Sequence, residues 1–172
     1  MNKAIFFDRD GTLIIDQHYP NDPNQIEYFP DCFDILKKLQ NQNYMLFIVT
    51  NQSGVAKGLI EEEQLEAIHQ QMEQDFKKHN IKITEYFSAP YLSTSNHYYR
   101  KPNPGMLVEA IKSYNIDPSQ SWMLGDKTSD VEAGLKCGCK SILLSQKEHR
   151  QNPNYYTCKD LSEAFEYINK PS

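Results

Sequence analysis

The chain has 172 residues, with 23 acidic and 18 basic side chains and a formal net charge of −5 at pH 7. This length fits one domain spanning residues 1–172, and a domain of about this size buries roughly 70% of the surface of its unfolded chain. Acidic and basic residues are interspersed, whereas nucleic-acid binders gather basic residues on one face, so neither nucleic acid nor a membrane surface is expected as a partner. The composition does not exclude binding of a small anionic ligand, because such a ligand needs only a local positive pocket.

The first residues of the chain and the number of cysteines indicate the cellular compartment of the protein. Met1 to Asp8 reach a charged cluster at once, which leaves no room for the apolar region of a signal peptide. No run approaches the roughly 18 apolar residues of a membrane span. Four irregularly spaced cysteines are too few for a disulfide framework. The sequence therefore predicts a soluble, reduced, cytoplasmic protein, which we expect to be a monomer.

Short apolar runs alternate with longer segments of helical periodicity along the chain. The runs show little alternation, as strands buried on both faces do, and predict strands at Ala4–Phe7, Tyr44–Thr50, Glu85–Ser88, Ser121–Gly125 and Ser141–Leu144. Apolar residues at intervals of three and four predict helices at Asp31–Gln42, Glu61–Asn80, Gly105–Asn115, Ser129–Cys137 and Asp160–Ile168. This order is typical of a Rossmann-like α/β fold, a parallel sheet flanked by helices, and leaves no stretch for a large cap domain.

The first polar motif, Asp8-Arg9-Asp10-Gly11-Thr12, directly follows the first predicted strand. Side chains alternate along an extended chain, so Asp8 and Asp10 face the same pocket. Two carboxylates that close repel each other unless a divalent cation or a shared proton holds them, and Mg²⁺ prefers such oxygen ligands. A plain turn at the end of a strand is the other interpretation, since Asp and Gly are common there.

Three further motifs follow later strands: residues 50–54 (TNQSG), 100–102 (RKP) and 125–130 (GDKTSD). The first offers neutral donors for phosphate oxygens, and the lysine of the second offers a compact positive charge. In the third, Asp126 completes an oxygen-ligand set, and Asp130 either orients it or caps the helix. Each motif alone also fits an ordinary polar loop. Together they indicate a site, because ligands of such sheets bind outside the carboxyl ends of the strands.

The order of these motifs resembles that of the haloacid dehalogenase (HAD) superfamily phosphatases, subfamily III. It consists of an Asp-x-Asp pair, a threonine, a lysine and a downstream acidic pair. The sequence is more closely similar to the D-glycero-D-manno-heptose-1,7-bisphosphate 7-phosphatase family, with the histidinol-phosphatase family as a near neighbour. Asp16, Tyr19 and four segments carry this similarity: Phe7–Leu13, Val49–Gly58, Arg100–Met106 and Gly125–Lys127.

The resemblance implies a phosphatase that acts on a small phosphorylated metabolite, a sugar phosphate on the way to a lipopolysaccharide precursor. Asp8 would be the nucleophile that forms an aspartyl-phosphate, and Asp10 the general acid and base. Thr50 and Lys101 would stabilise the phosphoryl oxygens. Mg²⁺ would be held by Asp8, Asp126 and the backbone carbonyl of Asp10, with Asp130 behind these ligands. The residues implied for substrate binding are Asp16, Gln17, His18, Tyr19, Asn51, Gln52, Ser53, Arg100 and Lys127.

The sequence departs from both families in the loop before Arg100. Many members bind a structural zinc there through three cysteines and a histidine, but residues 89–99 contain no cysteine and only His97. One ligand cannot hold a tetrahedral zinc, so we predict no zinc and expect the tyrosines to hold the loop by packing. His97 is expected as a surface residue. Cys137 and Cys139 are expected as buried structural thiols, and His69 and His149 show no ligand spacing.

Three other functions stay open at this point. A histidinol-phosphate phosphatase would differ in substrate only. A polynucleotide 3′-phosphatase uses similar motifs, although the acidic balance argues against it. A phosphate-binding module without activity would share the fold, although every expected catalytic position is occupied.

Overall fold

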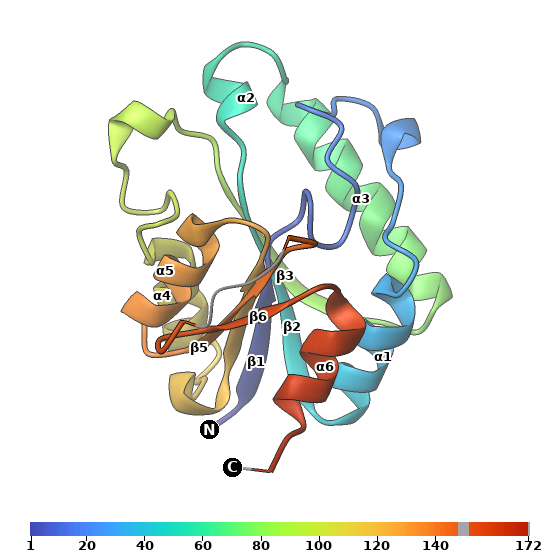
Figure 1. Ribbon diagram of the computed structural model, residues 1–172. Helices are drawn as coiled ribbons and strands as arrows, with labels where there is room; N and C mark the ends of the chain where they lie inside the picture. Colours follow the sequence, from blue (N-terminus) through green and yellow to red (C-terminus); the bar gives the residue numbers. More distant parts are fainter. Residues whose placement is uncertain (148–151, 172) are drawn as a thin grey trace.

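The computed structural model describes residues 1–147 and 152–171 and contains one sheet of six parallel strands (Figure 1). The strand order is β3-β2-β1-β4-β5-β6, and all neighbours pair in parallel. The strands are β1 Lys3–Phe7, β2 Tyr44–Asn51, β3 Ile83–Ala89, β4 Trp122–Gly125, β5 Lys140–Leu144 and β6 Tyr156–Cys158. The first strand lies at the centre, so the residues that follow it emerge in the middle of one edge of the sheet.

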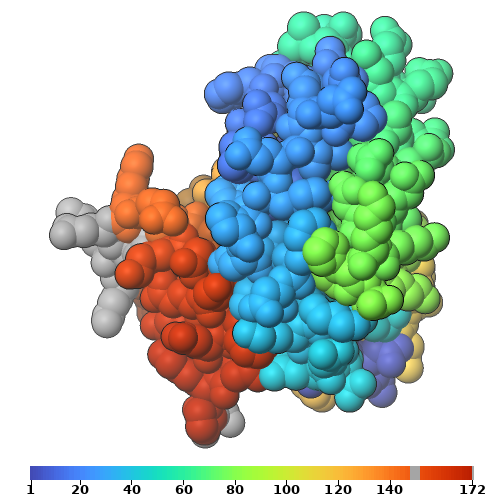
Figure 2. All heavy atoms as spheres, turned by 90° about the vertical axis from the view of Figure 1, so that its right-hand side faces the viewer, coloured from blue at the N-terminus to red at the C-terminus, as the bar shows by residue number. Residues whose placement is uncertain are grey.

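Helices cover both faces of this sheet. They are α1 Cys32–Asn41, α2 Ser53–Ala56, α3 Glu62–Lys78, α4 Gly105–Ser113, α5 Thr128–Lys136 and α6 Leu161–Ile168, with short 3₁₀ turns at Pro23–Gln25, Ser93–Ser95 and Pro118–Gln120. Figure 1 shows α4 and α5 on one side and α1, α3 and α6 on the other, and Figure 2 views the latter face. No helix of the described chain is long and apolar enough to cross a membrane.

Alternate residues of β1 divide the core into two layers. Ile5 and Phe7 belong to the apolar cluster that α1, α3 and α6 cover, whereas Ala4 and Phe6 belong to the cluster under α4 and α5. All four side chains have no exposed surface. Because successive side chains of a strand point to opposite faces, an uninterrupted apolar run is what a central, doubly covered strand requires.

Four helices end in the same way. Asn43, Asn80, Asn115 and Gly138, each one residue beyond the helix C-cap, have positive φ values of 65°, 55°, 50° and 89°. Asn and Gly adopt this left-handed conformation most readily, and it turns the chain away from the helix axis. These stops return the chain to the amino end of the next strand.

The predicted fold class, a parallel α/β sheet flanked by helices, is confirmed. The five predicted strands and five predicted helices exist, with ends within two residues of those expected. The strand β6 and the short helix α2 were missed, because three and four residues are too short to show a period. Cys139 is buried as expected, whereas Cys137 is only half-buried. His149 lies outside the described residues, and a single domain over residues 1–172 stays a prediction.

Candidate active site

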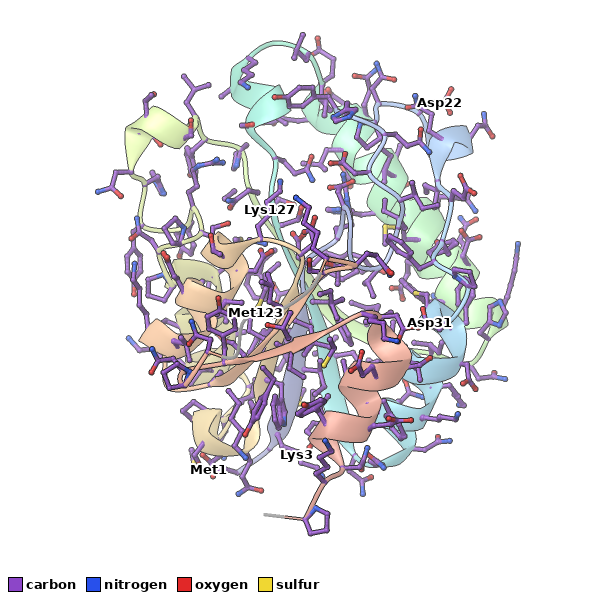
Figure 3. The ribbon with its side chains drawn as sticks, viewed as in Figure 1. Met1, Lys3, Asp22, Asp31, Met123 and Lys127 are labelled. Atoms are coloured by element: carbon purple, nitrogen blue, oxygen red, sulfur yellow. The ribbon has the colours of Figure 1, made fainter. Side chains whose placement is uncertain are left out.

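The carboxyl ends of three adjacent strands bring the sequence motifs together. Asp8 follows β1, Thr50 lies near the end of β2, and Asp126 follows β4. The register aligns Phe7 with Ile48 on one side and with Leu124 on the other, and Asp8 N donates to the Leu124 carbonyl at 2.9 Å. Figure 3 shows Lys127 at this end of the sheet. The motifs therefore converge where the fold places ligands.

Lys101 carries the positive charge at the centre of the site. Its ammonium donates to Asp8 Oδ1 at 2.8 Å and to the Val49 carbonyl at 2.7 Å, and lies 2.6 Å from Asp130 Oδ1. The residue is only 2% exposed. Burial alone would lower the pKa of Lys101, but the carboxylates of Asp130 and Asp8 outweigh burial and raise it. Lys101 is therefore charged at neutral pH, and the two carboxylates are its partners.

Asn51 fixes the main chain of Lys101. Its side-chain amide donates to the Lys101 carbonyl at 2.9 Å and accepts from the Lys101 amide at 3.0 Å. These two bonds join the end of β2 to a segment 50 residues away. Asn51, expected to bind substrate, also lines the neighbouring cavity, so the same residue holds the lysine and faces the substrate space.

Three carboxylates form a cluster that fits a cation. One oxygen each from Asp8, Asp126 and Asp130 lies within 4.8 Å of the others. Asp126 Oδ1 is buried and has no hydrogen-bond partner among the described residues. Burial and then the Asp8 charge raise the pKa of Asp126 to about 8 and that of Asp130 to about 6. Repulsion of this kind is relieved by a proton or by a hard cation, and an all-oxygen donor set suits Mg²⁺.

Gly11 leaves the room that this cluster needs. Its φ is +83°, and a Cβ at this position would overlap the carboxylate of Asp126. A glycine adopts this conformation without strain and adds no side chain. Any larger residue at position 11 would therefore displace Asp126 as well as strain the turn after β1.

Asp10 lies beside the cluster, with its carboxylate turned elsewhere. Its Oδ2 accepts from Gln52 Nε2 at 3.0 Å and from Arg9 Nε at 3.2 Å, and its Oδ1 accepts from Arg9 Nη2 at 3.3 Å. The residue lines the substrate cavity. The Asp10 carboxylate is not part of the cluster of Asp8, Asp126 and Asp130, and a contribution of Asp10 to the metal site through its backbone carbonyl stays a prediction.

Gln52, expected to bind substrate, also has a role in holding neighbouring side chains. It is 5% exposed, and its amide donates to Thr50 Oγ1 at 2.8 Å and to Asp10 Oδ2 at 3.0 Å. These bonds connect the threonine expected to bind phosphate with the carboxylate expected to transfer the proton. Gln52 thus lines the cavity and also holds the side chains of Asp10, which lines it too, and of Thr50.

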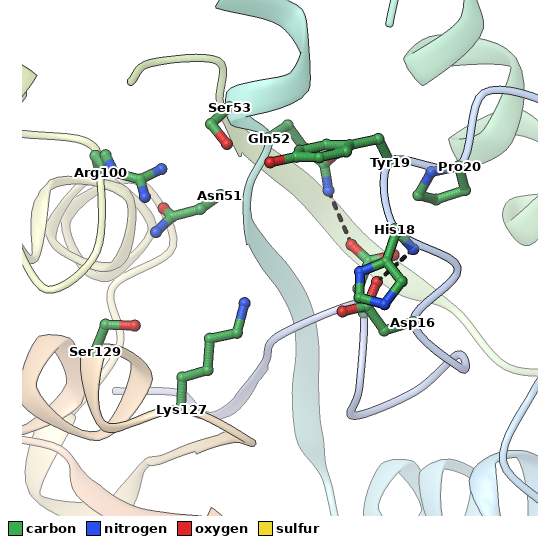
Figure 4. A pocket seen from close by; sticks show the side chains of 11 residues that line it. Asp16, His18, Tyr19, Pro20, Asn51, Gln52, Ser53, Arg100, Lys127 and Ser129 are labelled. Carbon is green, nitrogen blue, oxygen red and sulfur yellow. Dashed lines mark hydrogen bonds between the residues drawn. The ribbon is translucent and has the colours of Figure 1, made fainter. Parts of the chain in front are cut away.

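A cavity of about 250 Å³ opens next to Asp10 (Figure 4). In Figure 4, Arg100 and Asn51 lie on one side of it, His18 and Tyr19 on the other, and Lys127 and Ser129 below. The lining contains the expected residues Asp16, His18, Tyr19, Asn51, Gln52, Ser53, Arg100 and Lys127. Pro20 and Ser129 also line it and were not expected. Gln17 is exposed and lies outside this lining.

Tyr19 and Lys57 meet at the rim of this cavity. Lys57 Nζ donates to Tyr19 Oη at 2.6 Å, and the hydrogen bond and charge of Lys57 lower the pKa of Tyr19. Tyr19 is 41% exposed and has a positive φ of 59°. Lys57 lies within one of the segments that carry the family resemblance, but only its position against Tyr19 in space assigns it to the rim.

The loop before Arg100 is held by stacked rings. His97 stacks on Tyr91 with centroids 3.6 Å apart and lies 5.9 Å from the ring of Tyr99. Arg100 Nη1 donates to the Tyr91 carbonyl at 3.2 Å. This packing supports the expectation that tyrosines hold the loop, and His97, expected at the surface, is half-buried within the stack. The absence of zinc stays a prediction.

Comparisons with known proteins agree with this geometry. The family model described as "Polynucleotide kinase 3 phosphatase" matches residues 3–165. The D-glycero-beta-D-manno-heptose-1,7-bisphosphate 7-phosphatase of Haemophilus influenzae is 39% identical over 150 residues, covering 84% of this chain and 82% of that protein. The D-glycero-alpha-D-manno-heptose-1,7-bisphosphate 7-phosphatase of Campylobacter jejuni is 32% identical over 166 residues, covering 96% of this chain and 95% of that protein.

A solved structure extends the likeness to the whole fold. D,D-heptose 1,7-bisphosphate phosphatase from B. bronchiseptica, complexed with magnesium and phosphate, superposes with a TM-score of 0.87 at 25% identity, covering 96% of this chain and 97% of that one. Fold and site together define a phosphatase of the haloacid dehalogenase type. Within that class, the chain belongs to the polynucleotide kinase 3 phosphatase family.

Proposed function

We propose that this chain removes the 7-phosphate of a D-glycero-D-manno-heptose 1,7-bisphosphate, with Asp8 as the nucleophile. The observation that carries the proposal is the buried contact of Lys101 with Asp8 and Asp130, next to a cavity lined by Arg100 and Lys127. A monophosphate needs one cationic site, whereas a bisphosphate needs two. Lys101 supplies one cationic site beside Asp8, and Arg100 and Lys127 supply a second one in the cavity.

In the first step, Asp8 attacks phosphorus. Lys101 holds Asp8 Oδ1, which leaves the other carboxylate oxygen to form the new P–O bond as the bond from phosphorus to the sugar oxygen breaks. Asp10 gives its proton to the departing sugar oxygen. Thr50 Oγ1, fixed by Gln52, and the charge of Lys101 stabilise the phosphoryl oxygens.

In the second step, water replaces Asp8 on phosphorus. Asp10, now a carboxylate, takes the proton of the attacking water, and the P–O bond to Asp8 breaks. The products are inorganic phosphate, the free Asp8 carboxylate and a protonated Asp10. Asp8 and Asp10 thereby regain their starting states, and the proton from water replaces the one that left on the sugar oxygen.

The acidic cluster is where the proposal places Mg²⁺. Asp8 and Asp126 would hold the ion together with the backbone carbonyl of Asp10. Asp130 would stand behind these ligands, because its carboxylate already contacts Lys101 and Lys127 N. A bound Mg²⁺ would neutralise charge between the Asp8 carboxylate and the anionic substrate. The buried, unpartnered Asp126 Oδ1 supports this assignment. Magnesium is also present with phosphate in the B. bronchiseptica relative.

The decisive experiment is a turnover comparison across substrates. Purified protein is assayed with both anomers of the heptose bisphosphate, because relatives carry either the alpha or the beta name, and with histidinol phosphate. Each substrate is tested with Mg²⁺ and with excess EDTA. The proposal expects the highest kcat/KM for one heptose anomer, with turnover lost in EDTA. A preference for histidinol phosphate would refute the substrate assignment.

A second candidate, favoured by the description of the matching family model, is a polynucleotide 3′-phosphatase. The net charge of −5 disfavours a polyanionic duplex. An oligonucleotide with a 3′-phosphate, added to the same assay, separates the two candidates, because each predicts a higher kcat/KM for its own substrate. Faster release of phosphate from the oligonucleotide would favour the second candidate.

A further inference from the structure

Arg9 is the largest side chain without exposed surface in the described part of the chain, and the reaction outlined above gives it no task. A buried guanidinium is costly unless its charge is paired and its N–H groups are bonded. Its surroundings therefore show what the fold gains by burying it.

One side of the guanidinium contacts Asp10. Arg9 Nε lies 3.2 Å from Asp10 Oδ2 and Nη2 lies 3.3 Å from Oδ1, so two parallel N–H groups meet two carboxylate oxygens. Such a fork fixes the plane of a carboxylate as well as its position. This contact and the hydrogen bond from the Gln52 amide at 3.0 Å restrict the rotation of the Asp10 side chain.

The opposite side of the guanidinium contacts His69. Arg9 Nη1 lies 3.0 Å from His69 Nε2. Because arginine has only donors, Nε2 must accept and the ring proton must be on Nδ1. Burial and the adjacent Arg9 charge lower the pKa of His69 to about 3, which is consistent with a neutral ring.

His69 is itself held by two elements of the fold. It lies on α3, and its ring packs against Tyr86 of β3 with centroids 5.0 Å apart. Tyr86 Oη donates to Glu73 Oε2 at 3.2 Å, one turn further along α3. The guanidinium thus connects the packed unit of α3 and β3 to a carboxylate at the end of β1.

We propose that Arg9 and His69 are a positioning pair that aims the Asp10 carboxylate at the leaving oxygen of the substrate. The inference rests on the proposed function, since it presupposes that Asp10 transfers the proton. Neither Arg9 nor His69 lines the substrate cavity, so both act through Asp10. His69 fixes the orientation of the Arg9 guanidinium, and the guanidinium fixes the orientation of the Asp10 carboxylate.

The leaving group distinguishes positioning from mere support of the fold. The alkoxide of a sugar needs a proton as it departs, whereas p-nitrophenolate is stable without one. Because kcat/KM reports the steps up to that departure, a misdirected Asp10 lowers kcat/KM for the sugar phosphate and spares p-nitrophenyl phosphate. A general loss of structure lowers both alike.

The test compares His69→Leu, His69→Gln and unchanged protein on the heptose bisphosphate and on p-nitrophenyl phosphate with Mg²⁺. His69→Leu removes the acceptor, and we expect kcat/KM for the heptose bisphosphate to fall about 10–100-fold, within the ~10²–10⁴ that a general acid contributes. His69→Gln retains an acceptor and should regain most of this loss. Gln70→Leu, an exposed neighbour on α3, is the matched control and should leave both substrates unaffected.

Each outcome decides. A selective loss in His69→Leu that His69→Gln restores supports the positioning pair. Equal losses on both substrates, or no loss on either, overturn it and leave the proposed function intact. No turnover by the unchanged chain overturns the proposed function and the inference with it. Should His69→Leu fail to fold, Arg9→Lys, which keeps the charge but lacks the fork, must show the same selective loss.

Discussion

In the inner network, Asp8, Lys101 and Asp130 are buried and each charge contacts another, whereas at the rim of the cavity Asp16, His18 and Tyr19 are exposed. The contacts of Lys101 with Asn51 and Asp8 join segments that are 50 and 93 residues apart in sequence. At the rim, a short-range contact such as that of His18 N with Asp16 Oδ1 at 2.9 Å is typical.

This difference separates two tasks. A buried ion network is rigid and expensive to disturb, so it suits groups that must meet a transition state. An exposed rim changes at little cost to the fold, so it suits the choice of substrate. Substitutions at the two ends should therefore have different consequences, and the first three of the following four experiments test that separation.

The largest effect is expected for Asp8→Asn. The amide has the size of the carboxylate but is not a nucleophile, so kcat on the heptose bisphosphate should fall at least ~10⁴-fold. The matched change at the rim, Asp16→Asn, should alter KM rather than kcat. Steady-state assays with Mg²⁺ measure both variants. A near-normal rate for Asp8→Asn would contradict a covalent intermediate.

Next in size is the effect of Lys101→Met on stability. Removal of one partner leaves the carboxylates of Asp8 and Asp130 buried and unpaired, which should lower the free energy of unfolding by about 3–5 kcal/mol. Lys127→Met, the same change at an exposed position, should cost less than about 0.5 kcal/mol. Urea unfolding in EDTA compares them, and equal losses would show that the inner network adds no special stability.

A smaller effect is expected for Arg100→Met and Lys127→Met on substrate affinity. Each removes a charged donor, worth about 1.5–3 kcal/mol, so KM for the bisphosphate should rise roughly 10–100-fold. With p-nitrophenyl phosphate, which has a single phosphate, KM should change little. A comparable rise for both substrates would move these residues from the rim to the reacting phosphate.

The last effect, confined to acidic pH, is a pH dependence of stability from His69. Its pKa is lowered from 6.5 to about 3 in the folded protein, so the unfolded chain binds the proton first as the pH falls. The stabilisation is present above pH 6.5 and is lost toward pH 3, by up to about 1.4 kcal/mol per pH unit. Urea unfolding at several pH values should show a shallower slope for His69→Gln. Identical slopes would mean that His69 ionises normally.

The sequence predicted those parts of the site that follow from position along a strand. Asp8, Thr50 and Asp126 each occur at the end of an apolar run, and the sheet brings such ends together. The strand β6 and the helix α2 were missed, since neither is long enough for a periodic pattern. The expected monomer and the cytoplasmic location stay predictions.

Contacts that depend on folding could not be predicted in this way. Arg9 and His69 are 60 residues apart, and nothing in their spacing shows that one ring accepts from the other. Asp130 illustrates a different limit. It was expected either to orient a ligand or to cap a helix, and it accepts from Lys127 N at 3.0 Å while its other oxygen lies against Lys101.

The two hydrogen bonds between the Asn51 side chain and the backbone of Lys101 have a consequence for redesign of the site. Because the amide and carbonyl of that residue are held independently of what its side chain does, the attachment point next to the nucleophile is set by β2 and not by the ammonium. Substituents of different length or acidity installed there would start from the same place in space. The side chain at position 101 can therefore be exchanged for one of different chemistry while the backbone that carries it keeps its position.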